Sequence, residues 1–155
     1  METTTADRGI RGLARSNTDT AASGAGAGLL HRAITDRVLG GFFRVYRELG
    51  AGFLEAVYAR SLAIELIEIG LELGSEVPVS VCYRGREVGF FRADLVVAGR
   101  VLVELKAAER LVAAHEQQVI NYLNATQLEV ALLLNFGPRP TFRRFVLTNN
   151  NKHHL

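Results

Sequence analysis

Apolar residues recur every three or four positions between residues 29 and 49, which is the spacing that one face of an α-helix requires. A second run with this spacing covers residues 53–69 and is bounded by glycines at positions 52 and 70. The pattern therefore predicts two consecutive helices. Residues 1–28, which precede them, are rich in Thr, Ser, Ala and Gly and show no such period, so we expect a disordered tail there.

From Val77 onward the apolar period falls to about two, which is typical of β-strands. We expect a hairpin whose turn lies at residues 83–86 and whose second strand ends at residue 97. Another turn, at residues 98–100, leads into a third strand at residues 101–106. That strand is mostly apolar, so it is predicted to lie near the centre of the sheet.

The last part of the chain returns to a helical period and then to strands. We predict a helix at residues 115–125, a buried strand at 129–135, a more exposed strand at 142–147 and a frayed end at 149–155. The resulting order α-α-β-β-β-α-β-β predicts an α/β (α+β) domain over residues 29–148. Such an order favours a mostly antiparallel sheet with one crossover helix and helices on both faces.

The composition supports one globular domain, because the chain has 155 residues, of which 48% are hydrophobic and 22% are charged. Its formal net charge of +2 is far below that of a histone-like protein. Cys82 is the one cysteine, so an intramolecular disulfide is excluded, and no Cys/His spacing fits a zinc site. The single cysteine is typical of a reducing, cytoplasmic setting, which we expect here. No apolar run approaches the roughly 20 residues that span a bilayer, so we expect a soluble protein without membrane contact.

Three charged residues are predicted to meet in the middle of the sheet. Glu104 and Lys106 are two residues apart on one strand and therefore project from the same face. An antiparallel pairing centred near Gly99 sets Asp94 opposite Glu104. Opposed carboxylates repel each other unless a cation lies between them, and all-oxygen ligands suit Mg²⁺ or Mn²⁺.

Lys106 has a possible chemical role in such a site, because an ammonium group can stabilise developing negative charge or help to deprotonate a water molecule. Only Lys106 and Lys152 are lysines among the 18 basic residues. The alternative interpretation is a solvated charge pair on a strand, which is the commoner origin of a Glu-x-Lys pattern. The apolar residues around Asp94 and Glu104 favour the functional interpretation, because charges within buried strands need partners.

Several ordered motifs resemble one known family. Residues 52–58 match the pattern Gly-x-x-Glu-x-x-Tyr, and the other motifs are Tyr-Arg-Gly at 83–85, Arg-Ala-Asp-Leu-Val-Val at 92–97, Val-Glu-Leu-Lys-Ala at 103–107, Gln-Val-Ile-Asn-Tyr-Leu at 118–123 and Leu-Asn-Phe-Gly at 134–137. This series resembles the GxxExxY proteins, a branch of the PD-(D/E)XK nuclease superfamily, over about residues 34–147. Ala93 stands where the superfamily name has proline, which is commonly absent.

The resemblance implies a restriction-endonuclease-like core, with a mixed four- to five-stranded sheet flanked by helices. It implies that Asp94, Glu104 and Lys106 form the nuclease triad, with the two carboxylates as metal ligands. Glu55 and Gln118 receive supporting catalytic roles. Glu55 is equally compatible with a charge at a helix start, and Gln117 leaves the register of Gln118 open.

The tyrosines of these motifs are assigned differently. Tyr58 and Tyr122 are expected to be core aromatics with a hydrogen-bonded hydroxyl rather than catalysts.

The expected function is Mg²⁺- or Mn²⁺-dependent hydrolysis of phosphodiester bonds, with DNA as the substrate and metal-activated water as the nucleophile. A first alternative is a catalytically weak nucleic-acid-binding or DNA-repair accessory module with the same fold. A second alternative is an interaction protein that uses the sheet only as a scaffold. A partner protein or a homodimer is a further possible source of selectivity, because no base-reading motif is visible in the sequence.

Overall fold

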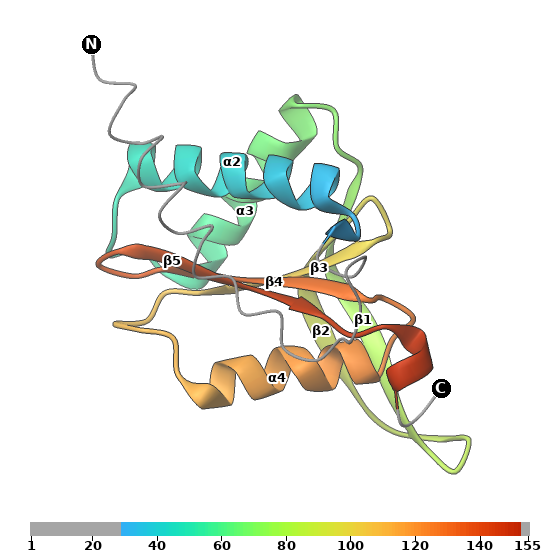
Figure 1. Cartoon of the computed structure of the whole chain (residues 1–155). Helices are drawn as coiled ribbons and strands as arrows, with labels where there is room; N and C mark the ends of the chain where they lie inside the picture. Colours follow the sequence, from blue (N-terminus) through green and yellow to red (C-terminus); the bar gives the residue numbers. More distant parts are fainter. Residues whose placement is uncertain (1–28, 153–155) are drawn as a thin grey trace.

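The computed structural model describes residues 29–152. The predicted tail at residues 1–28 and the last three residues lie outside the described residues. Within them, a five-stranded sheet has α2 and α3 on one face and α4 on the other (Figure 1). The elements are α2 (Arg32–Leu49), α3 (Glu55–Glu68), β1 (Leu73–Tyr83), β2 (Arg86–Val97), β3 (Val101–Lys106), α4 (Ala113–Asn124), β4 (Val130–Phe136) and β5 (Pro140–Val146).

The sheet has the strand order β1-β2-β3-β4-β5. All neighbouring strands are antiparallel except β3 and β4, which are parallel and are connected through α4. This arrangement confirms the predicted hairpin, the central position of β3 and the single crossover helix. The α+β fold with a mixed sheet is consistent with a restriction-endonuclease-like core.

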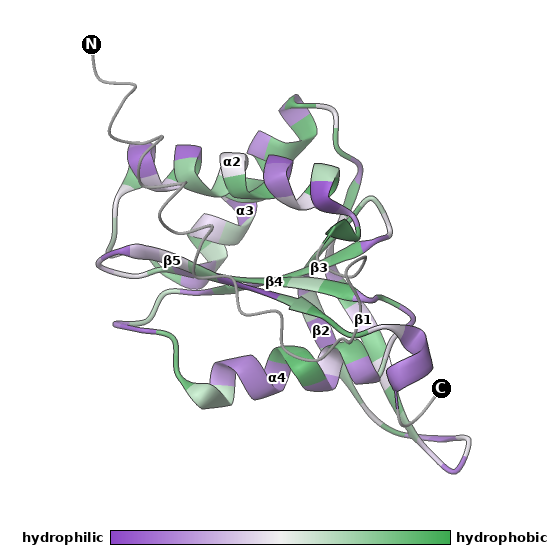
Figure 2. Ribbon diagram, in the orientation of Figure 1, coloured by the Kyte–Doolittle hydropathy of each residue, from purple (hydrophilic) through white to green (hydrophobic). Residues whose placement is uncertain are grey.

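Strand alternation divides the apolar residues between two cores, one on each face of the sheet. Val103 and Leu105 of β3 pack with α2 and α3, whereas Leu102 packs with Val119 and Leu123 of α4. Figure 2 shows the central strands in green, between helices that carry hydrophilic residues. Helices cover both faces of β3 and β4, so the apolar residues of these strands are buried whichever face they point to.

The C-terminal region up to residue 152 is more ordered than expected. We predicted a strand at 142–147 that is more exposed than the one before it, yet Phe142, Phe145 and Val146 are buried because α2 and α4 cover the two faces of β5. We also predicted a frayed end at residues 149–155; within its described part, residues 149–152, Asn149–Asn151 forms a 3₁₀ turn. The Lys152 ammonium donates hydrogen bonds to the carbonyls of Thr126 and Leu128 at 2.7 and 2.6 Å, which holds this segment against the domain.

Between residues 29 and 152, no helix is both long enough and apolar enough to cross a membrane.

Candidate active site

The carboxylates of Asp94 and Glu104 meet where β2 and β3 stop pairing. The strand pairs run from Val97 with Val101 to Leu95 with Val103, so the next residues in the same register are Asp94 and Glu104. The Asp94 N–H donates to Glu104 Oε1 at 3.2 Å, and the Leu105 N–H donates to Asp94 Oδ2 at 2.8 Å. At this point the backbone N–H groups therefore donate to carboxylate oxygens, where in regular strand pairing they would donate to backbone carbonyls of the neighbouring strand.

A local break in strand alternation places Asp94 between the two cores. Ala93 packs in the core under α4 and Leu95 packs in the core under α2 and α3, although residues two apart normally share a face. On the neighbouring strand β1, Glu76 adopts a left-handed φ of 50°. Non-glycine residues rarely adopt this conformation, and it interrupts β1 beside Asp94.

Burial and a neighbouring like charge make Glu104 an unusual acid. Its side chain is 4% exposed. Burial, and after it the Asp94 carboxylate, raises the pKa of Glu104 to about 8, while the Asp94 N–H and the Lys106 ammonium act in the opposite direction. A cation placed between two such carboxylates stabilises their charged forms. Lys106 lies near enough to influence Glu104, as its position on the strand predicts.

Helix α4 borders the two carboxylates with an amide and a phenol. The Gln118 amide donates to the Tyr122 hydroxyl at 2.6 Å. Burial raises the pKa of Tyr122, the hydrogen bond from Gln118 lowers it, and the negative charges of Glu104 and Asp94 raise it further. Gln117 instead donates to Asn121 on the exposed side of the helix, whereas Gln118 bonds to Tyr122, whose pKa responds to the two acids. The i, i+4 spacing of Gln118 and Tyr122 was the sequence signal that the two residues share a face of the helix.

Glu55 approaches the site from the opposite side of the sheet. It begins α3 and, with Arg60, lines a cavity of about 690 Å³ that Asp94 also lines. Within the described part of the chain, no three Asp, Glu, His or Cys side chains are close enough to share a metal ion. A metal at this site would therefore have two direct carboxylate ligands, Asp94 and Glu104, with Glu55 farther away.

Tyr58 has a structural role. It is completely buried and stacks on Phe136 with ring centroids 4.3 Å apart. Its hydroxyl donates to the Gly50 carbonyl at 2.6 Å and accepts from the Phe53 N–H at 3.2 Å, which fixes the turn before Glu55. The prediction of a core aromatic with a hydrogen-bonded hydroxyl is confirmed for Tyr58. Tyr122 differs, since it is half-buried and lies beside the acids, a proximity that the sequence did not reveal.

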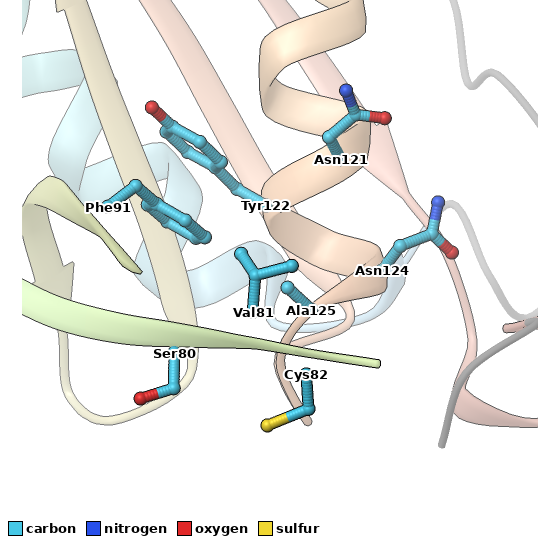
Figure 3. A pocket seen from close by; sticks show the side chains of 8 residues that line it. All are labelled: Ser80, Val81, Cys82, Phe91, Asn121, Tyr122, Asn124 and Ala125. Atoms are coloured by element: carbon cyan, nitrogen blue, oxygen red, sulfur yellow. The ribbon is translucent and has the colours of Figure 1, made fainter. Parts of the chain in front are cut away.

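A second cavity, of about 600 Å³, lies between β1 and the C-terminal half of α4. Figure 3 shows the Phe91 and Tyr122 rings against each other at its wall, and their centroids are 3.5 Å apart with an interplanar angle of 4°. Asn121 and Asn124 add carboxamides to its lining. Tyr122 thus connects this cavity to the carboxylate pair.

The family model of the PD-(D/E)XK nuclease superfamily matches residues 32–145, from the start of α2 nearly to the end of β5. The chain belongs to the PD-(D/E)XK nuclease superfamily. A search of curated proteins finds no match. A solved structure titled "Crystal structure of SSO0001" is similar at 15% sequence identity and a TM-score of 0.39, over 96% of this chain and 78% of that chain.

Nucleases of the PD-(D/E)XK superfamily usually use divalent metal ions, and the residues present fit such an ion. Asp94 and Glu104 supply hard oxygen ligands, and Mg²⁺ characteristically binds through one or two carboxylates while keeping several waters. Burial, and after it the Asp94 carboxylate, raises the pKa of Glu104, so a cation beside the pair would favour its charged form. The donor set is therefore chemically suited to Mg²⁺ or Mn²⁺.

Proposed function

We propose that this protein is a nuclease of the GxxExxY branch that hydrolyses phosphodiester bonds in DNA with Mg²⁺ or Mn²⁺. The observation that carries the proposal is the meeting of the Asp94 and Glu104 carboxylates between β2 and β3, with Lys106 two residues farther along β3. Membership of the PD-(D/E)XK superfamily supports the same chemistry and a nucleic-acid substrate.

Each side chain of the site has a distinct proposed role. Asp94 and Glu104 would hold the divalent ion, whose charge would polarise a phosphoryl oxygen and acidify a water molecule. Lys106 stabilises the negative charge that develops on the phosphoryl group as the water oxygen attacks phosphorus and the bond to the leaving oxygen breaks. Gln118, oriented by the Tyr122 hydroxyl, orients the attacking water, and Glu55 supports the site from the far wall of the cavity through water.

The test separates metal binding from turnover. Lys106→Met is expected to abolish cleavage and to preserve Mg²⁺ or Mn²⁺ binding, whereas Asp94→Ala is expected to abolish both, because only the carboxylate is a ligand. Lys106→Arg should also fail, because a planar guanidinium cannot place its charge where the ammonium lies. The measurements are metal titration by calorimetry and cleavage of plasmid, linear duplex, single-stranded DNA and RNA.

Two results would contradict parts of the proposal. Undiminished cleavage by Lys106→Met would remove Lys106 from the mechanism. A wild-type protein that binds metal and DNA but cleaves none of the substrates would instead favour the binding or repair-accessory module.

A further inference from the structure

A cavity of about 370 Å³ with three arginines lies beyond the end of β3. Its walls come from residues 109–111, in the loop between β3 and α4, and from the turn and strand that follow β4. The guanidinium-bearing residues are Arg110, Arg139 and Arg143, and Glu109 is the single acid in the lining. The sequence motifs assign these arginines no role.

The arginines differ in how their charges are compensated. Arg143 forms an ion pair with Glu116 of α4 at 3.4 Å. Arg110 and Arg139 are exposed, and no ion pair joins either of them to an acid among residues 29–152. A planar guanidinium presents a fork of donors that matches phosphate geometry and is always charged. The chemistry of the lining therefore suits phosphate groups.

The cavity is built on tightly fixed backbone. The Asn135 side chain accepts from the Ala108 N–H at 2.9 Å and donates to the Ala108 carbonyl at 3.0 Å. Gly137 approaches the same loop so closely that an added Cβ would lie 2.0 Å from the Ala108 oxygen. The Tyr46 hydroxyl bonds to the carbonyls of Gly137 and Pro138 from the other side. Asn135 and Gly137, both in the Leu-Asn-Phe-Gly motif, thus hold together the two loops that carry Arg110 and Arg139.

The position of the cavity relates it to the proposed reaction. Lys106 is the last residue of β3, and Arg110 follows four residues later in the chain. β5, which carries Arg143, lies two strand spacings from β3, or about 10 Å. A nucleic-acid strand with its scissile phosphate beside Lys106 can therefore place a neighbouring phosphate at the arginines.

We infer that the cavity lined by Arg110, Arg139 and Arg143 binds backbone phosphates of the nucleic-acid substrate beside the scissile bond. This inference rests on the proposed function and defines part of the substrate-binding surface. Contacts of this kind fix the register of the strand and carry no sequence information.

The experiment measures binding without turnover. The full chain is titrated against fluorescently labelled single-stranded and duplex oligonucleotides in EDTA, over a range of salt concentrations. The Arg110→Ala/Arg139→Ala variant is expected to bind more weakly and to have a shallower dependence of log K on log[salt]. The slope should fall by roughly 1.4 to 1.8, because each lost phosphate contact removes about 0.7 (single strand) to 0.9 (duplex). Both arginines are exposed, and circular dichroism checks that the variant folds.

The matched control is Arg32→Ala/Arg100→Ala, which removes the same charge. Arg32 begins α2 and Arg100 immediately precedes β3, and neither residue lines the cavity. Equal slopes for the two double variants would overturn the inference. It would also be overturned if millimolar inorganic phosphate raised the melting temperature through Arg110 and Arg139 while the oligonucleotide slopes stayed equal, because the cavity would then be a small-anion site.

A cleavage assay with Mg²⁺ separates this inference from the proposed function. If the wild-type protein cleaves nothing but the salt slopes differ as expected, the phosphate site stands and the nuclease proposal fails. If the wild-type protein cleaves and the slopes are equal, the nuclease proposal stands and the phosphate site fails.

Discussion

Asn135 and Glu104 are buried polar residues on neighbouring central strands, with exposed fractions of 1% and 4%. The Asn135 amide is neutral, and both of its polar ends bond to Ala108. Glu104 lies against a second acid, and burial, followed by the charge of that acid, raises its pKa. Satisfied polar groups stabilise a fold, whereas a carboxylate pair that needs a cation is the arrangement expected of a reactive site.

The largest expected effect on stability concerns the close contact between Gly137 and the Ala108 backbone, which the Asn135 side chain also holds. Gly137→Ala should destabilise the domain by about 3 kcal/mol or more, because the new methyl group would clash with the backbone oxygen of Ala108. Chemical denaturation measures the free energy of unfolding. Gly89→Ala is the control, since no atom lies within 4 Å of its added Cβ. Equal stabilities for the two variants would show that the loops do not pack as described.

A smaller loss of stability is expected when the Asn135 side chain is removed. Asn135→Ala leaves the buried N–H and carbonyl of Ala108 without their partner, which typically costs about 1–3 kcal/mol. Asn150→Ala changes an exposed asparagine and should be near neutral. Thermal unfolding of both variants checks the prediction, and an unchanged melting temperature for Asn135→Ala would contradict it.

Replacing Glu104 is expected to increase the stability of the metal-free protein, whereas the two substitutions above decrease it. The Glu104 pKa of about 8 lies above its ordinary 4.5, so the folded protein binds more protons than the unfolded chain between these pH values. In EDTA, the free energy of unfolding should therefore fall as pH rises from 4.5 to 8. Glu104→Gln should remove this fall and stabilise the metal-free protein at pH 8 by on the order of 1–2 kcal/mol.

The control for this pH series is Glu48→Gln, on the exposed side of α2. Its pH profile should match that of the wild-type protein. A wild-type profile that is flat between pH 4.5 and 8 would contradict the description of the acid pair.

The smallest expected effect distinguishes two adjacent glutamines. Gln118→Ala should lower the cleavage rate about tenfold, or roughly 1.4 kcal/mol of transition-state stabilisation, because in the proposed mechanism the amide orients the attacking water. Gln117→Ala should retain nearly full activity, because Gln117 faces solvent and bonds to Asn121. Steady-state kinetics measure both variants, and equal losses would place Gln118 outside the site.

The sequence predicted the helices and strands well because the spacing of apolar residues indicates which face of each element is buried. The two α2 and α3 helices, the hairpin and the central β3 all follow from the spacing of apolar residues. The short turn around Gly99 also fixed the register of β2 and β3, and this register alone predicted that Asp94 would meet Glu104.

The sequence could not predict features that depend on contacts between distant segments. From sequence alone, β5 is predicted to be more exposed than it is, because the covering helices α2 and α4 come from other parts of the chain. Residue 152 is likewise predicted to be frayed, because the carbonyls that accept hydrogen bonds from its ammonium lie 24 and 26 residues away in the sequence. For the same reason, the proximity of Tyr122 to the acids and the grouping of Arg110, Arg139 and Arg143 become visible only in three dimensions.

What the sequence determined by itself is therefore local: periodicity, turn positions, the facing of Glu104 and Lys106, and the motifs of a nuclease superfamily. Tertiary structure decided the rest. It separated Tyr58, whose hydroxyl fixes a turn, from Tyr122, which borders the carboxylates, and it raised the pKa of Glu104. The physical reason is that burial and electrostatic interaction depend on which atoms surround a group, and segments far apart in the sequence supply most of those atoms.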